Sequence, residues 1–171
     1  MVDIRPALPA HTRGIAALVE PLAEKRVLIA KDLIDYFEDI QEFVVAIDDG
    51  RVIGCGALHV LWDDIAEIRT LAVAPEYQGR GLGRDLYLAL ESRAYELGLT
   101  RLFCLTFEKS FFTGLGFTEI EGTPVGQNVY AEMLRSHDDG VAEFLELARV
   151  KPNTLGNFRM LKELGAPVSE V

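Results

Sequence analysis

The fold is decided by the stretch EIRTLAVAPEYQGRGLGR, residues 67–84. Its composition predicts a strand rich in β-branched residues, a turn that contains a proline, a glycine-rich loop and then a helix. Gly79, Gly81 and Gly83 alternate directly before the helical run of residues 85–91. Glycines let the backbone approach a ligand closely, and a helix start supplies unpaired N–H groups and the positive end of a dipole. The stretch therefore predicts an anion site, most often for phosphate, with a plain connecting turn as the alternative.

Two common phosphate loops do not fit these residues. A P-loop requires Gly-x-x-x-x-Gly-Lys followed by Ser or Thr, and no such pair follows the glycines. A Rossmann loop requires its third glycine one position later, where Arg84 stands. The pattern that fits is Gln78-x-x-Gly81-x-Gly83. With the strand before it and FFTGLGF at 111–117 after it, the chain resembles the GNAT acetyltransferases, whose acetyl-CoA loop reads Arg/Gln-x-x-Gly-x-Gly/Ala.

This resemblance implies an α/β (α+β) GNAT fold, a mixed and mostly antiparallel sheet flanked by helices, in a single domain of residues 1–171. It also implies acetyl-CoA as cosubstrate and no metal. In the family the loop amides hold the CoA pyrophosphate, while the preceding strand splays from its neighbour and hydrogen-bonds the pantetheine arm. The positions that match are Leu71, Ala72 and Val73 in the strand, and Gln78, Gly79, Arg80, Gly81, Leu82, Gly83 and Arg84 in the loop.

Length and composition agree with a globular protein. At 171 residues and 49% hydrophobic content, the chain is long enough to bury a substantial core. No apolar run reaches the roughly 18–20 residues of a membrane span, and the amino terminus does not begin a signal peptide, so we expect a cytoplasmic protein. Cys55 and Cys104 lie in apolar runs without a CxxC pattern, which predicts reduced core cysteines. The three histidines are scattered, which argues against a metal site.

The formal net charge of −10 argues against nucleic acid or an anionic membrane as a partner. It also means that any anionic ligand, CoA included, needs local positive charge. Arg80, Arg84 and the helix start could supply that charge. The alternative for both arginines is ordinary solvated surface charge.

The remaining elements follow from hydrophobic periodicity and turn residues. Strands are expected at 2–7, 43–47, 52–62, 67–73, 101–107 and 117–121, with a hairpin turn at Asp48-Asp49-Gly50. Helices are expected at 11–25, 31–40, 82–98, 109–115 and 128–135. Residues 158–164 have helical composition, but the resemblance implies a closing strand there. Antiparallel strands followed by a βαβ unit predict a mixed α/β sheet.

Several short strings resemble one subgroup, the short bacterial amino-acid N-acetyltransferases that are similar to the catalytic domain of N-acetylglutamate synthase. These strings are residues 41–43, 54–59, 67–73, 101–106 and 151–153. The subgroup implies acetylation of the α-amino group of glutamate, or of glutamine, as the first step toward arginine. A homodimer and a monomer both stay open.

Acetyl transfer to an amine requires a base, because an α-amino group is protonated at neutral pH. Glu67, at the start of the central strand, is the best candidate, with a salt bridge to Arg69 or to a lysine as the alternative. The backbone N–H of Leu71 is the expected donor to the oxyanion of the tetrahedral intermediate. Ala72 and Val73 would continue along the pantetheine.

Acetyl transfer also requires an acid that protonates the leaving thiolate. Many family members carry a tyrosine in the short helix near the thiol, where this chain has Phe111 and Phe112. The thiolate would then leave without a dedicated phenol, or Thr106 or Thr70 would orient the amine or relay a proton. Both threonines fit ordinary strand positions equally well.

An amino-acid substrate needs fixed cations, since an unpaired buried carboxylate is costly. Lys31 corresponds to a basic segment of the synthases that holds the substrate carboxylate, and Arg69 and Arg159 are further candidates. The alternative for Lys31 is a solvated lysine. Two other functions stay open: acetylation of a polyamine, an antibiotic or a protein N-terminus, which the acidic charge favours, and a non-catalytic acyl-CoA-binding module.

Overall fold

The structure, a computed structural model, describes residues 1–25, 31–150 and 156–165. The strands are β1 (Asp3–Pro6), β2 (Phe43–Asp48), β3 (Arg51–Val60), β4 (Ile65–Val73), β5 (Arg101–Thr106), β6 (Thr118–Glu119) and β7 (Phe158–Glu163). They form one sheet in the order β1-β2-β3-β4-β5-β7-β6. The chain divides into two compact units, residues 1–102 with 163–171, and residues 103–162.

The helices are α1 (Thr12–Glu24), α2 (Leu33–Glu38), α3 (Leu82–Glu96), α4 (Lys109–Gly114), α5 (Gln127–Met133) and α6 (Asp139–Phe144). Three short 3₁₀ turns, η1 (Pro9–His11), η2 (Ile40–Glu42) and η3 (Pro75–Tyr77), join them to the strands. No helix in the described ranges is long and apolar enough to cross a membrane. Within the same ranges, no three His, Cys, Asp or Glu side chains are grouped so that they could hold a metal ion.

The predicted mixed α/β sheet flanked by helices is confirmed, and most expected elements are present. Residues 158–163 form strand β7, so this segment is the closing strand that the resemblance implies and not the helix that its composition suggests. The helix expected at 31–40 is shorter, because α2 ends at Glu38 and η2 follows. Helix α6 was not predicted. Its start is marked by Asp138, whose Oδ1 accepts a hydrogen bond from the Val141 N–H at 2.8 Å, but six residues give too short a periodic signal.

The β2–β3 hairpin closes through the turn that the sequence predicts. Asp48 pairs with Arg51, and the two residues between them, Asp49 and Gly50, have φ angles of 48° and 75°. Two positive φ angles are the signature of the tight turn that matches the twist of a hairpin.

Helix α3 packs closely on β3 because two glycines leave room for it. A Cβ on Gly54 would lie 2.8 Å from Leu86 Cδ1, and one on Gly56 would lie 2.9 Å from Leu90 Cδ1. The helix ends at Glu96, and Gly98 just beyond it, with a φ of 75°, reverses the chain where the sequence predicts a C-capping glycine. These glycines fix the distance between the sheet and the helix that begins at the predicted anion loop.

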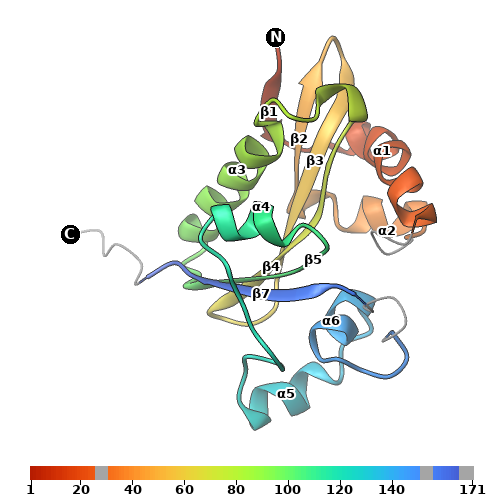
Figure 1. The fold of residues 1–171 in the computed structure, drawn as a ribbon. Helices are drawn as coiled ribbons and strands as arrows, with labels where there is room; N and C mark the ends of the chain where they lie inside the picture. The colour runs from red at the N-terminus through yellow and green to blue at the C-terminus, as the bar shows by residue number, and fades with distance from the viewer. Residues whose placement is uncertain (26–30, 151–155, 166–171) are drawn as a thin grey trace. The chain divides into compact units, whose positions relative to one another are not determined.

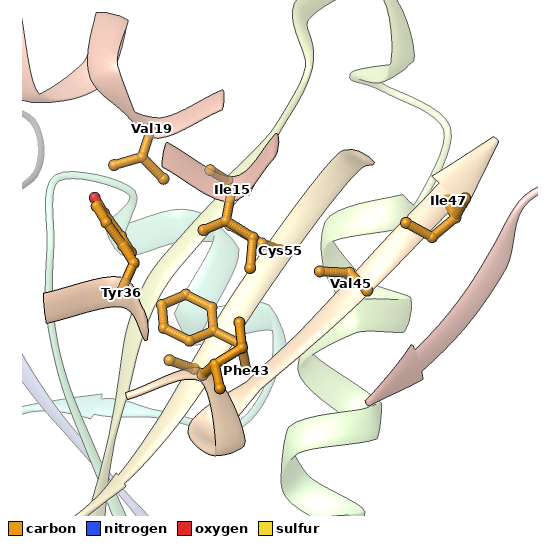
Figure 2. Packing of buried hydrophobic residues seen from close by; sticks show 10 residues of the cluster. Ile15, Val19, Tyr36, Phe43, Val45, Ile47 and Cys55 are labelled. Atoms are coloured by element: carbon orange, nitrogen blue, oxygen red, sulfur yellow. The ribbon is translucent and has the colours of Figure 1, made fainter. Parts of the chain in front are cut away.

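Helices α1 and α2 cover the opposite face of β2 and β3 (Figure 1). The cluster beneath them includes Ile15 from α1, Tyr36 from α2, Phe43 from β2 and Cys55 from β3 (Figure 2). The Tyr36 and Phe43 rings are tilted at 57° with centroids 6.1 Å apart. Cys55 and Cys104 are both buried and neither is part of a disulfide, so both lie in the core as expected.

The titration of this cluster gives a stability prediction at high pH. Burial raises the pKa of Cys55 from 9.0 to about 12, and burial followed by nearby Cys55 and Asp35 raises that of Tyr36 from 10.0 to about 12. The folded state therefore holds protons that the unfolded state loses, so both contributions are complete below pH 9 and disappear as the pH rises toward 12.

We expect the free energy of unfolding in urea to fall between pH 8 and pH 11, with Tyr36 accounting for about 1 kcal/mol. Tyr36→Phe should remove that part of the decrease, because it keeps the ring and deletes the hydroxyl. Tyr95→Phe, at a 43% exposed tyrosine on α3, is the control and should leave the decrease unchanged. Equal pH dependence in all three proteins would contradict the assignment.

Candidate functional site

The centre of the first unit is an irregularity in β4. Cys55 pairs with Ala72 and Ala57 pairs with Arg69, so two steps along β3 oppose three steps along β4. Strand β4 therefore carries one extra residue, a β-bulge. At this point Thr70 has a φ of 54°, in the left-handed region that β-branched residues rarely adopt. Such a conformation costs about 1–3 kcal/mol and is found most often at functional sites.

The bulge changes which side chains share a face of the sheet. Arg69 lies opposite Ala57, which belongs to the cluster under α1 and α2, and Glu67 lies two positions earlier on the same face. Beyond the bulge, Leu71 packs in the cluster under α3 instead. The side chains of Arg69 and Leu71 thus lie on opposite faces of the sheet, although two positions in a regular strand would share one face. The Leu71 N–H, which the sequence predicts as the oxyanion donor, lies at this irregularity.

After β4 the chain passes through η3 into the glycine loop. Gln78 Nε2 donates a hydrogen bond to the Val73 carbonyl oxygen at 3.2 Å, which folds the loop back onto the strand end. Gly79 and Gly81 have φ angles of 76° and 81°, and no heavy atom lies within 4 Å of a Cβ built on either. Gly81 is the N-cap residue of α3, and because it has no side chain, no side-chain hydrogen bond caps the first turn of the helix. The loop therefore leaves room for a ligand at the helix start.

Two side-chain contacts connect η3 to the β2–β3 hairpin. Tyr77 Oη donates to Asp48 Oδ2 at 2.6 Å, and Arg51 Nη1 lies 2.7 Å from Glu76 Oε1. The Tyr77 hydrogen bond is the largest of the causes that lower the pKa of Asp48. Arg80 lies over the Tyr77 ring, 5.4 Å from its centroid. These contacts hold η3, the segment directly before the glycine loop, against the hairpin. They also fix the position of Arg80, one of the two arginines of the loop.

Glu67 and Arg69 form a buried ion pair on β4. Each side chain is 7% exposed, and Arg69 Nε lies 3.2 Å from Glu67 Oε1. Glu67 stands opposite His59, which in turn contacts Glu42 through Nδ1 and Oε1 at 2.7 Å. The salt bridge with Arg69 is the alternative that the sequence offers for Glu67. The salt bridge and the base role are compatible, and the base role stays a prediction.

Lys31 is half-buried just before α2, with Nζ 5.9 Å from the centroid of the Tyr36 ring. The ammonium group is therefore held near the first unit's buried cluster. The residues directly before it, 26–30, lie outside the described residues. Its role toward a substrate carboxylate stays a prediction.

The other two candidates belong to the second unit. Thr106 is buried, and its Oγ1 accepts a hydrogen bond from the Glu108 N–H at 2.8 Å. Arg159 donates from Nε, Nη1 and Nη2 to the carbonyl oxygens of Gly122, Glu143 and Phe144 at 3.1, 3.1 and 2.6 Å. Both contacts are structural in kind, so the catalytic role of Thr106 and the substrate role of Arg159 stay predictions. Residues 151–153, used for the subgroup resemblance, lie outside the described residues.

Two parts of the site were missed by sequence reasoning. The contact between Tyr77 and Asp48 joins positions that are 29 residues apart, and the contact between Cys55 and Thr70 joins positions 15 apart. The Asp-Asp-Gly hairpin turn was the one available signal, because it places Asp48 at the edge of the hairpin. Nothing in the sequence shows which residue of β4 carries the bulge.

Comparison with known proteins gives a consistent family. The model of the Acetyltransferase (GNAT) family matches residues 15–117. An amino-acid acetyltransferase of Mycobacterium tuberculosis is 52% identical over 161 residues, which is 92% of each chain. An amino-acid acetyltransferase of Pseudomonas putida is 36% identical over 104 residues, and the match spans only 24% of that protein.

Two solved structures carry the same fold. The crystal structure of Rv2747 from Mycobacterium tuberculosis, in complex with CoA and NLQ, has a TM-score of 0.92 and 50% identity, covering 95% of this chain and 99% of that one. N-acetylglutamate synthase from Neisseria gonorrhoeae, complexed with coenzyme A and N-acetyl-glutamate, has a TM-score of 0.75 and 27% identity. It covers 96% of this chain and 35% of that one.

The two ends of α3 offer a matched test of the loop. Gly81 and Gly98 have nearly equal φ angles, 81° and 75°, and nothing lies within 4 Å of a Cβ on either. Alanine in the left-handed region costs about 1–2 kcal/mol, so Gly81→Ala and Gly98→Ala should destabilise the protein equally in urea. Only Gly81→Ala places a methyl group at the helix start, and it should weaken CoA binding about tenfold or more by calorimetry. Equal CoA affinity in the two variants would contradict the loop assignment.

Proposed function

Because the chain belongs to the GNAT family of acetyltransferases, we propose that it transfers the acetyl group of acetyl-CoA to the α-amino group of an amino acid, glutamate or glutamine. The observation that carries this proposal is the bulge in β4. The Glu67–Arg69 pair and the Leu71 N–H lie on this one strand, and the glycine loop follows it in the chain. The names of the relatives from Mycobacterium tuberculosis and Pseudomonas putida support an amino acid as the acceptor.

The loop residues fit the phosphates of acetyl-CoA. Two left-handed glycines leave open space at the start of a fifteen-residue helix that has no side-chain cap. Arg80 and Arg84 are exposed beside it, so they supply local positive charge on a chain of net charge −10. Bound acetyl-CoA supplies an acetyl group activated as a thioester. Its pantetheine arm would follow Ala72 and Val73.

The reaction requires one bond to form and one to break. The neutral amine nitrogen attacks the thioester carbonyl carbon, the C–N bond forms, and the C–S bond breaks to release the CoA thiolate. Glu67 takes the amine proton directly or through water, and the Leu71 N–H donates to the oxyanion of the tetrahedral intermediate. Arg69, whose Nε lies 3.2 Å from Glu67 Oε1, orients the Glu67 carboxylate. The thiolate takes a proton from water, since phenylalanines occupy positions 111 and 112.

The acceptor carboxylate needs a short-range partner. At long range, a chain of net charge −10 repels glutamate. Lys31 is the cation that we assign to the carboxylate. Its half-buried position reduces screening by salt. N-acetylation of glutamate fits the first step of arginine biosynthesis in the cytoplasm, and glutamine is the other acceptor of this kind.

We expect Glu67→Gln to lower kcat by about 10²–10⁴-fold, the usual contribution of a positioned base, while CoA affinity stays unchanged. The substitution also weakens the ion pair with Arg69, so CoA titration serves as the measure of folded protein. Glu96→Gln, which breaks the exposed pair with Arg93 at the far end of α3, is the control for loss of a carboxylate and should keep normal kcat. If Glu67→Gln turns over normally at neutral pH, Glu67 is structural.

Lys31→Ala should raise the KM for the amino acid about tenfold or more, because a charge-assisted hydrogen bond to a carboxylate contributes about 1.5–3 kcal/mol. The KM for acetyl-CoA should hardly change. Lys25→Ala, at an exposed lysine, is the control.

A panel of glutamate, glutamine, glutamine with an amidated α-carboxyl group, and spermidine identifies the acceptor by thiol release. Loss of activity with the amidated compound alone would indicate that the α-carboxylate is recognised. If spermidine outcompetes the amino acids, the acceptor is a polyamine and only the acetyltransferase activity remains. If no amine releases thiol although CoA binds, the chain is an acyl-CoA-binding module.

A further inference from the structure

Cys55 lies on β3 directly opposite the bulge in β4. Its Sγ–H donates a hydrogen bond to the Thr70 carbonyl oxygen at 3.3 Å, and Cys55 is the register partner of Ala72 in the β3–β4 ladder. Thr70 and Ala72 are the two neighbours of Leu71. Cys55 therefore faces the backbone on both sides of the residue whose N–H is assigned to the oxyanion, and its thiol binds the carbonyl group directly before that N–H.

We propose that Cys55 is a positioning residue for acetyl transfer: its thiol holds the bulge in β4 and thereby orients the Leu71 N–H toward the reacting carbonyl. Cys55 itself touches neither substrate, since it is fully buried under α1 and α2. The effect on rate rests on the proposed function, because it requires an acetyl group to be transferred.

The bulge needs such a contact. A regular antiparallel strand is held by paired backbone groups, but the extra residue of a bulge is left out of the ladder. Thr70 also has an unfavourable φ of 54°, so the local chain does not favour this conformation by itself. The hydrogen bond from the Cys55 thiol on β3 to the Thr70 carbonyl oxygen restrains the backbone at this position, where the backbone ladder is interrupted.

A thiol suits these surroundings better than a hydroxyl does. Cys55 is surrounded by apolar side chains, among them Ile15, Phe43 and Val45 (Figure 2). A buried thiol behaves as a small apolar group with a weak S–H donor, so it loses less on leaving water than serine would. Burial also raises the pKa of Cys55 to about 12, which keeps the donor proton in place at neutral pH.

The competing interpretation is an ordinary core cysteine that fills space. Replacing such a residue lowers stability but leaves the turnover of the folded protein unchanged. A positioning residue changes kcat in the folded protein. The chain's other cysteine, Cys104, is buried in β5 and provides a matched control.

We expect Cys55→Ala to lower kcat about tenfold, a fraction of the 10²–10³-fold lost when an oxyanion donor is removed outright. Both KM values should change by less than about twofold, because the loop and Lys31 are intact. Cys55→Ser keeps a donor and should recover part of kcat in spite of lower stability. Cys104→Ala should lower the melting temperature without changing kcat. If Cys55→Ala and Cys104→Ala have the same kcat when folded, the proposal is wrong.

A second measurement requires neither turnover nor a variant at position 55. The chain has two cysteines, so Cys104→Ala leaves Cys55 as its one thiol. The infrared S–H stretching band of this protein should lie at lower frequency than that of a thiol in an apolar solvent, because Cys55 donates a hydrogen bond. A band at the position of the free thiol would overturn the proposal. Absence of turnover in the wild-type protein would instead overturn the proposed acetyl transfer, so the two failures are distinguishable.

Discussion

The extra residue in β4 is the constraint on which the rest of the site depends. In a regular ladder, side chains two positions apart share one face, so Glu67, Arg69 and Leu71 would all point the same way. The bulge places the first two under α1 and α2 and sends Leu71 toward α3. One strand can therefore carry the proposed acid–base pair on one face and the proposed backbone donor at the bulge, followed directly by the glycine loop proposed for the phosphates.

The packing around the bulge supports this arrangement from both faces. Gly54 and Gly56 bring α3 close to β3, which fixes the helix start relative to the strand. On the opposite face, Cys55 contacts the backbone of the bulge from within the cluster of α1 and α2. The hairpin adds a third support, because Asp48 holds Tyr77 at the entrance of the loop. The donor side of the site is thus built from contacts within the first unit.

The features that could be predicted from the sequence are those determined by residues close together in the chain. The Asp49-Gly50 turn, the end of α3 at Gly98 and the alternating glycines are encoded by neighbouring residues, so spacing alone identifies them. The position of the bulge is set by the register between two strands, and Thr70 has no residue-type signal for a left-handed conformation. The contacts of Arg159 depend likewise on carbonyl groups far along the chain, which no spacing rule connects to it.

Thr70 also bears on how this protein could evolve or be engineered. A threonine held at a φ of 54° is a local deficit of stability, since glycine would adopt the same conformation without steric cost. Selection for heat resistance would favour that exchange. Glycine, however, has wide backbone freedom, and the amide that follows it would lose part of its fixed direction. At this residue, relief of steric strain and a fixed direction for the following amide are opposing demands.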